Sequence, residues 1–438
     1  MAQSTPHPAT RTSSLLNILG VAGHAGDYAR LNGATTANIV SDAQYLGVTK
    51  WRDGLGGPNV IYSALYAAGI SIIAFPWTPS DSGYADNVAF ARQVAAIGPG
   101  ALYALEGPNE PGNFGFTYNG VSTGGGASWA GVAAWQKAWR AAVHADAALA
   151  GTPVWSPSLV GQEVGDYGLQ YLTVPARLPA GVLTAAGTQF ADGEDLHLYP
   201  MYQGHAQPVD QNADAFVTTL GGDDVTTYLN GYSGQTLAQA ESDTKAITEF
   251  GYPATGGTPN GITTDVPTQG KAILNGLMNA WNEGYSVLCV YTFYEDAPDG
   301  GAGFGLLNGP GNPKVSGAYL HNFTTTLKDA GSTAKMFAPG SLSYTISGLP
   351  STGKSLLFQK SNGNLELIIW NNVEDWNFSA GKAMTISPTT VTVTFASSHS
   401  TVNVYDPTVG SSPVTTAARA TSVRASLTDH PLIIEVLR

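Results

Sequence analysis

The sequence predicts an α/β fold, a (β/α)8 TIM barrel followed by an antiparallel β-sandwich. Through the first three quarters of the chain, short apolar runs typical of strands alternate with segments of helical spacing, about eight times over. From about residue 331 the pattern changes to short strand-like runs at hairpin spacing, with no helix of any length between them. We therefore expect a catalytic barrel over residues 1–330 and a β-sandwich over residues 331–438. Whether the sandwich also takes a strand from the N-terminal residues stays open at this level.

Apolar and β-branched runs mark the expected barrel strands. These runs cover residues 15–22, 48–51, 70–75, 101–105, 154–156, 193–199, 242–250 and 285–294. Polar residues gather where the runs end, among them Arg52, Asn109, Glu110 and Glu249. Because the C-terminal ends of parallel barrel strands meet at one rim, we expect these polar residues to share one site.

Segments with apolar residues at helical spacing separate these runs. A proline near its start supports a helix over residues 58–68. The clearest helix covers residues 128–149, where Trp135, Trp139 and Val143 recur at helical spacing and indicate a buried face. The other expected helices cover residues 35–46, 84–97 and 268–283.

The expected sandwich strands are short and are separated by Gly, Pro, Ser and Asn residues, which favour turns. They cover residues 342–346, 355–359, 365–370, 389–395, 401–405 and 432–437.

Composition excludes several classes of function. Only 12% of the residues are charged and 43% are hydrophobic, which indicates a sizeable core and neutral polar surfaces. A net charge of −13 without a cluster of Lys and Arg argues against a nucleic-acid partner. No apolar stretch has the length of a membrane span, and no metal-binding helix motif or nucleotide loop is present. We expect no cofactor, no metal and no membrane partner.

The single cysteine, Cys289, lies in an apolar run and is expected to be a buried, inert thiol. The polar first residues carry no apolar signal-peptide core, so the chain is either cytosolic or a form from which a signal was removed. Low charge and many neutral polar residues favour export, and we expect a secreted or periplasmic monomer.

The pair Glu110 and Glu249 is the strongest functional signal. Each glutamate stands at the exit of an expected barrel strand, and the two are far apart in sequence. A retaining glycosidase needs such a pair, because one carboxylic acid protonates the leaving oxygen while the other carboxylate attacks the sugar. Asn109, directly before Glu110, is suited to hydrogen-bond the sugar 2-hydroxyl. Glu106 stands four residues before Glu110 and is the main rival for the acid.

Three short motifs resemble those of clan A glycoside hydrolases: Asn109-Glu110-Pro111, Glu249 in TEFGY, and Tyr291-Thr292-Phe293. With a β-sandwich attached to the barrel, the layout is similar to glycoside hydrolase family 39 and its relatives. The resemblance implies that Glu110 is the general acid/base and Glu249 the nucleophile of a retaining enzyme. It also implies cleavage of β-glycosides of equatorial type or of α-L-arabinosides, and we expect endo action on a polysaccharide. The clan usually has a Trp where this chain has Tyr291 or Phe293.

Several polar residues are expected to support this pair. Arg52 corresponds to the Arg that the clan places after strand two, where its constant charge keeps the nucleophile ionised. Tyr199 is expected to donate its phenol proton to Glu249, with His197 on the same face of the strand. Glu110 is expected to have a raised pKa, from partial burial and from the negative nucleophile.

We expect the substrate to contact a set of polar and aromatic side chains near the strand ends, because aromatic faces suit the stacking of pyranose rings. The set is Arg52, Trp77, Asn109, His197, Tyr199, Tyr252, Tyr291, Tyr294 and Glu295.

Alternatives stay open. His197 is also compatible with a structural histidine, Arg52 with a surface pair to Asp53, and each aromatic residue with ordinary packing. For the whole protein, a catalytically silent carbohydrate-binding protein and a transglycosylase are the competing hypotheses. The identity of the sugar and the position of the bond are not predicted.

Overall fold

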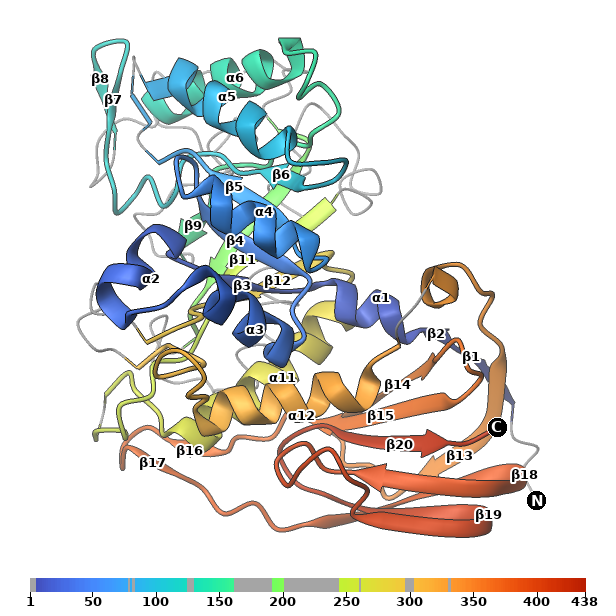
Figure 1. Ribbon diagram of the computed structural model, residues 1–438. Coiled ribbons are helices and arrows are strands. Elements are labelled where there is room, and N and C mark those ends of the chain that lie inside the picture. The colour runs from blue at the N-terminus through green and yellow to red at the C-terminus, as the bar shows by residue number, and fades with distance from the viewer. Residues whose placement is uncertain are drawn as a thin grey trace.

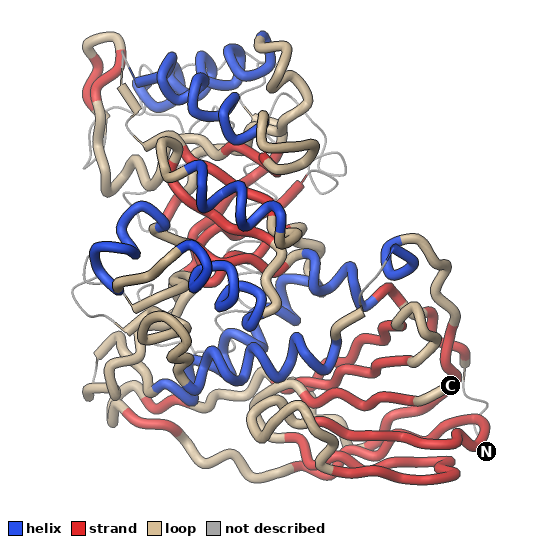
Figure 2. The backbone as a smooth tube through the Cα atoms, in the orientation of Figure 1, coloured by secondary structure: helices blue, strands red, loops and turns tan. Residues whose placement is uncertain are grey.

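The computed structural model describes residues 5–77, 79–80, 83–123, 130–160, 191–200, 244–259, 261–295, 303–329 and 332–438. Within these residues a curled parallel sheet with flanking helices is followed by a strand-rich C-terminal region (Figure 1). Figure 2 shows the same division, with helices along the parallel sheet and almost only strands and loops in the C-terminal region. None of the described helices combines the length and the apolar composition that crossing a bilayer requires.

The parallel sheet has eight strands in the order β6-β5-β4-β3-β12-β11-β10-β9, and every neighbouring pair is parallel. Their bounds are β3 (Leu19–Ala22), β4 (Lys50–Gly54), β5 (Ser71–Phe75), β6 (Leu102–Leu105), β9 (Leu159–Val160), β10 (Gly193–Leu198), β11 (Thr244–Phe250) and β12 (Val287–Val290).

The two ends of this sheet approach each other through residues 153–158, which precede β9. The Leu105 N–H donates to the Pro153 carbonyl at 2.9 Å, and the Trp155 N–H donates to the Leu105 carbonyl at 2.7 Å. On the other side, the Ser156 N–H donates to the Gly193 carbonyl at 3.1 Å. Residues 153–158 therefore connect β6 to β10, and the sheet curls strongly.

The helices lie between these strands in the chain. Their bounds are α1 (Thr12–Asn17), α2 (Ala25–Asn32), α3 (Thr36–Leu46), α4 (Asn59–Ala67), α5 (Gly83–Ala95), α6 (Ala130–Ala145), α11 (Val266–Asn282) and α12 (Val315–Leu327). Two helix starts follow from local chemistry. Thr35 and Asn38 form a reciprocal capping box on α3, and the Asp265 side chain accepts the Thr268 N–H at the start of α11.

Small and apolar side chains fill the inside of the curled sheet. Ile73, Ala104, Ala246 and Val287 pack there with Cys289, and all are fully buried. Burial raises the pKa of the Cys289 thiol, so it stays protonated and unreactive.

The C-terminal region is one eight-stranded sheet in the order β1-β13-β18-β20-β15-β14-β2, with β19 paired to β18. All its pairs are antiparallel except β14 with β2. The bounds are β1 (Pro6–Pro8), β2 (Thr10–Arg11), β13 (Ser341–Ser347), β14 (Gly353–Gln359), β15 (Leu365–Asn371), β18 (Thr389–Tyr405), β19 (Thr415–Leu427) and β20 (Leu432–Val436).

The remaining described elements are short. They are the two-stranded pairs β7 (Thr117–Tyr118) with β8 (Val121–Ser122) and β16 (Trp376–Asn377) with β17 (Lys382–Ala383), and a 3-10 turn at Ser332–Lys335.

The structure departs from the sequence pattern at several elements. The apolar run 15–22 is divided between α1 and β3. The expected strands 389–395 and 401–405 are one long strand, β18, which pairs with β13 through its first half and with β20 through its second half. Both halves also pair with β19, which the pattern did not predict.

Candidate active site

Four strand ends bring charged side chains to one place. Arg52 is in β4, Glu110 follows β6, His197 is in β10 and Glu249 is in β11. All four side chains are buried or nearly so, with Glu110 9% and Glu249 6% exposed. Such buried charges require partners, and the hydrogen bonds among these residues supply them.

Arg52 is the centre of this network. Its Nε donates to Glu106 Oε1 at 2.9 Å and its Nη2 to Glu106 Oε2 at 2.8 Å, a bidentate pair. Nη2 also donates to Asn109 Oδ1 at 2.6 Å, and Nη1 pairs with Glu249 Oε1. Although burial disfavours its charged form, the charges of Glu106 and Glu249 hold the pKa of Arg52 well above its ordinary value. Arg52 does not form the surface pair with Asp53 that was the alternative.

Glu249 is held through both of its carboxylate oxygens. Arg52 Nη1 donates to Oε1, and the Tyr199 hydroxyl donates to Oε2. These are the two contacts expected from the sequence. A cation and a phenol proton on the same carboxylate fix its orientation.

His197 joins the two glutamates. Its Nδ1 lies 2.6 Å from Glu110 Oε1 and 3.4 Å from Glu249 Oε2, while its Nε2 lies 3.3 Å from Arg52 Nη2. The Glu110 carboxylate accepts from Nδ1, and a guanidinium offers no lone pair to a proton on Nε2, so the imidazole proton is assigned to Nδ1. His197 thus donates to Glu110.

The raised pKa expected for Glu110 is not found. Burial raises the pKa of its carboxyl, but the hydrogen bond and charge of His197, the Asn113 amide and the charge of Arg52 outweigh burial, so the pKa is lowered. The expectation failed because it considered the negative nucleophile and not the donors around Glu110.

The backbone at Glu110 is also unusual. Its φ angle is 40°, in the left-handed region that favours glycine. The Glu110 N–H donates to the Ser158 carbonyl at 2.9 Å, which holds the residue against the segment leading to β9. Asn113 Nδ2 donates to Glu110 Oε2 at 3.2 Å. Strained backbone of this kind is concentrated at functional sites, where it orients a side chain.

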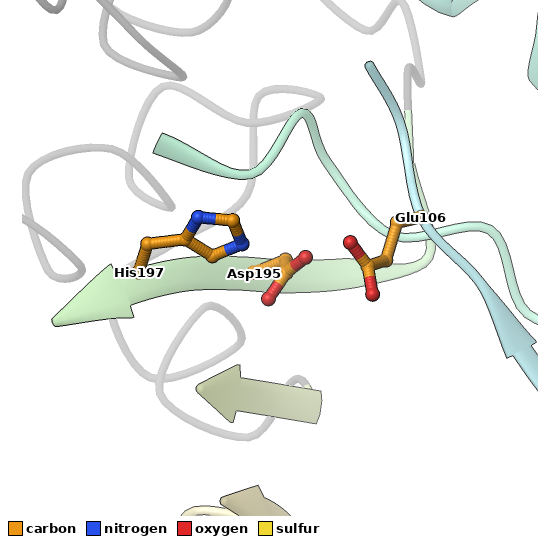
Figure 3. Close-up of side chains that lie close together, drawn as sticks. All are labelled: Glu106, Asp195 and His197. Atoms are coloured by element: carbon orange, nitrogen blue, oxygen red, sulfur yellow. The ribbon is translucent and has the colours of Figure 1, made fainter. Parts of the chain in front are cut away.

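A second layer of carboxyl groups lies beneath the first. Figure 3 shows Asp195 between Glu106 and His197, with Asp195 and His197 on the same strand, β10. Thr248 Oγ1 donates to Asp195 Oδ1 at 2.7 Å. Complete burial and the neighbouring charge of Glu106 raise the pKa of Asp195 well above its ordinary value. The raised pKa favours the neutral form of Asp195, and Glu106 is the acid that forms the ion pair with Arg52.

This arrangement separates the roles of the rival glutamates. Glu106 is fully buried and both its oxygens are taken by Arg52, so it is not available to a substrate. Glu110 and Glu249 retain some exposure. The geometry therefore favours Glu110 over Glu106 as the acid.

Two groups of ligand atoms in the described residues are close enough to hold a metal ion. They are Glu106, Asp195 and His197, and Glu110, His197 and Glu249. The guanidinium of Arg52 contacts members of both groups, and its positive charge opposes a second cation. The chemistry of this donor set fits an ion-pair network rather than a metal site.

The predicted aromatic contacts divide into two sets. Trp77 is 62% exposed, and Tyr291 is half-buried with its ring centroid 5.9 Å from that of Tyr199. Tyr252 and Tyr294, in contrast, do not line the site. Both rings are fully buried in the core because the loops that carry them fold inward, and the Tyr294 hydroxyl donates to Asp42 at 2.6 Å.

Glu295 is also engaged elsewhere. Its carboxylate accepts the backbone N–H groups of Gly303 and Gly305 at 2.8 and 3.0 Å, and it pairs with Lys314. It fastens the loop after β12, which replaces the expected contact with a substrate.

Two neighbours of the site were not predicted. The guanidinium of Arg52 lies over the ring of Phe75, 4.1 Å from its centroid, and the His24 ring lies 5.9 Å from that of Tyr291. Both residues stand at the ends of expected strands, which is the signal that would have found them.

No protein-family model and no curated protein matches this sequence. Solved structures do match. An endo-β-1,6-glucanase aligns with 100% of this chain and 93% of its own, at a TM-score of 0.50 and 12% identity. A glycoside hydrolase family 17 β-1,3-glucanosyltransferase from Rhizomucor miehei aligns with 69% of this chain and 97% of its own, at a TM-score of 0.46 and 14% identity. These identities are low, and the similarity to the endo-β-1,6-glucanase is one of fold.

Proposed function

We propose that this protein is a retaining glycoside hydrolase, with Glu110 as the general acid/base and Glu249 as the nucleophile. The observation that carries the proposal is the distance between the two carboxyl groups. One oxygen of Glu110 and one of Glu249 lie within 4.8 Å of each other and of a His197 ring nitrogen. Retaining enzymes have their two carboxyl groups about 5–5.5 Å apart, whereas inverting enzymes need roughly 6.5–9.5 Å to admit a water molecule.

The first chemical step follows from this geometry. A Glu249 oxygen attacks the anomeric carbon, the bond to the leaving oxygen breaks, and Glu110 gives its proton to that oxygen. His197 donates to Oε1 and Asn113 donates to one lone pair of Oε2, so the second lone pair of Oε2 carries the proton. In the second step Glu110 takes a proton from water, the water attacks the anomeric carbon, and Glu249 is released.

Asn109 Oδ1 accepts a hydrogen bond from Arg52 Nη2, which gives Asn109 a fixed position beside the pair. The Asn109 Nδ2 group remains to donate to a sugar hydroxyl, a contact that strengthens in the transition state.

The proposal includes the architecture. We infer a (β/α)8 barrel over residues 1–330 and a β-sandwich over residues 331–438. The N-terminal strands β1 and β2 belong to the sandwich, where they pair with β13 and β14. Parallel strand order and the hydrogen bonds through residues 153–158 support the barrel. The pairing of both halves of β18, around a separate apolar core, supports the sandwich. The low content of charged residues supports export as a monomer.

Substitution of the nucleophile tests the function. The Glu249→Gln variant keeps the shape of the side chain but cannot form the glycosyl–enzyme bond, so kcat should fall by roughly a thousandfold or more. A panel of aryl glycosides and polysaccharides, beginning with β-1,3- and β-1,6-glucans, provides the substrates. Glu374→Gln, an exposed glutamate of the C-terminal region, is the matched control and should retain activity.

NMR of the first-formed product tests the stereochemistry. Retention of the anomeric configuration is expected, and inversion would contradict the assignment of Glu249. If sugar acceptors compete with water for the intermediate, transglycosylation products of higher mass will appear. If the wild-type protein binds glycans and never cleaves them, the carbohydrate-binding alternative holds and the catalytic proposal fails.

A further inference from the structure

A cavity of about 450 Å³ opens beside the candidate active site, at the C-terminal ends of β3, β4 and β5. It is lined by residues that follow these strands and by the first turns of α2 and α5. None of these residues belongs to the Glu110–Glu249 pair, so the cavity is an addition to that site.

Two exposed aromatic rings form one wall. Trp77 is 62% exposed and Phe90 is 38% exposed, although both are large apolar side chains. Gly54 allows Trp77 to take this position, because a Cβ atom at residue 54 would lie 2.5 Å from Trp77 Cε3. A solvent-exposed indole held against a glycine beside a cavity is suited to stack on the apolar face of a sugar ring.

The cavity lies next to the proposed catalytic site, and two sets of side chains link them. On one side, the Arg52 guanidinium lies on Phe75, and the ring centroids of Phe75 and Trp77 are 6.2 Å apart. On the other side, His24 lines the cavity, and its ring lies next to that of Tyr291. Arg52 and Phe75 are buried, whereas His24 and Tyr291 are partly exposed, so a glycan chain bound across Glu249 would reach the cavity along the His24 side.

The charge on the cavity wall restricts the kind of sugar. The acidic side chains that line it are Asp27, Asp53 and Asp86, and none of the lining residues is a lysine or an arginine. Asp53 is buried and fixed by hydrogen bonds from the Ala25 and Gly54 N–H groups, Asp27 pairs with Arg30 at 2.7 Å, and Asp86 is exposed. Carboxylate oxygens accept hydrogen bonds from sugar hydroxyls and repel a uronic acid.

We propose that this cavity is a distal subsite for an uncharged sugar unit of the substrate chain, with Trp77 as its stacking platform. This inference rests on the proposed glycosidase function and deepens it. It makes the enzyme endo-acting, on a chain that extends past the cleaved bond toward β5. It also disfavours acidic polysaccharides, because a uronate in this subsite would meet the exposed carboxylate of Asp86.

The test compares substrates of different length. Oligosaccharides of two to six units are prepared from the polysaccharide that the wild-type protein cleaves, together with the p-nitrophenyl glycoside of the same sugar. Trp77→Ala should lower kcat/KM for the hexasaccharide at least about tenfold more than for the p-nitrophenyl glycoside, because only the longer chain reaches the ring. Met336→Ala, which also truncates an exposed apolar side chain but lies outside the cavity, should affect both substrates equally.

The charge of the subsite has its own test. Asp86→Lys should bind the C6-oxidised hexasaccharide, a uronate, more tightly than the wild-type protein does, as measured by calorimetry. Equal losses for long and short substrates in Trp77→Ala would overturn the subsite, and unchanged uronate affinity in Asp86→Lys would overturn the charge selection. Both results are distinguishable from failure of the proposed function, in which the wild-type protein itself has no activity on any length.

Discussion

At the scale of single residues, the site depends on the placement of protons. Arg52 lies against one nitrogen of His197 and thereby places the imidazole proton on the other, which faces Glu110. The same arginine neutralises Glu106 and holds Glu249. One guanidinium therefore determines the hydrogen-bonding state of both proposed catalytic carboxyl groups.

The hydrogen bond from His197 to Glu110 should affect how activity depends on pH. Glu110 acts as an acid while protonated, so activity is lost as the pH rises through its pKa. His197 lowers this pKa. In His197→Phe the pKa should rise, and the alkaline limb of the profile of kcat/KM against pH should move to higher pH. His399→Phe, in β18 and remote from the site, is the control; an unmoved limb in His197→Phe would contradict the assigned tautomer.

The buried acids Asp195 and Glu106 should respond differently to loss of their charge. Asp195 has a raised pKa, so its contribution to stability is complete below the pKa of the unfolded chain and is lost as the pH rises toward the folded pKa. Asp195→Asn should therefore become more stable than the wild-type protein as the pH rises.

Glu106→Gln leaves the Arg52 charge without its bidentate partner and should lower the free energy of unfolding by about 3–5 kcal/mol.

Urea unfolding at pH 5 and pH 8 measures both variants. Equal losses of stability in Asp195→Asn and Glu106→Gln would show that Asp195 is charged in the folded protein, contrary to its assigned state.

At the scale of elements, α11 connects the parallel sheet to the C-terminal region. Asn279 of this helix accepts a hydrogen bond from Trp370 Nε1 at 2.9 Å and exchanges bonds with Asn372 at 3.2 Å. Asn275 donates to the Asp429 carbonyl, and Lys271 pairs with the Asp429 carboxylate. Polar residues along one face of a buried helix are thus satisfied by the neighbouring sheet.

Loss of the Asn279 side chain should weaken this contact. Asn279→Ala leaves the buried indole N–H of Trp370 without an acceptor, which should lower the free energy of unfolding by about 1–3 kcal/mol. Asn282→Ala, on the same helix but exposed, should change it by less than about 0.5 kcal/mol. Thermal or urea unfolding measures both, and similar values for the two variants would contradict the importance of the contact.

At the scale of the whole molecule, one apolar cluster spans both regions, and a second cluster belongs to the C-terminal sheet alone. Phe358, Ile368, Trp370 and Ile433 of the C-terminal sheet pack in the same cluster as the residues around the parallel sheet. The N-terminal strands β1 and β2 pair with β13 and β14, so both ends of the chain lie in the C-terminal sheet (Figure 1). The loop that follows β11 also packs against the C-terminal region, where Gly257 lies beside Trp376 and Gly381.

The local apolar patterns predicted the positions of most strands along the chain. Most expected strands of the parallel sheet are present in the expected order, because a strand buried on both faces is an apolar run whatever lies beside it. The expected strand over residues 154–156 is wrong, since Val154 and Trp155 form only isolated bridges and the strand there is β9. Strand β19 was missed because most of its residues are exposed, small or polar, so its sequence lacks the apolar alternation of a half-buried strand.

By itself, the sequence determined which segments become strands and that Glu110 and Glu249 stand at strand exits. The tertiary structure alone decided what faces these residues. It buried Tyr252 and Tyr294, turned Glu295 toward a loop, and set His197 against Glu110, 87 residues away in the chain. The reason is physical, since burial periodicity is recorded locally along a segment, whereas pKa, tautomer and accessibility depend on partners that only the folded chain brings together.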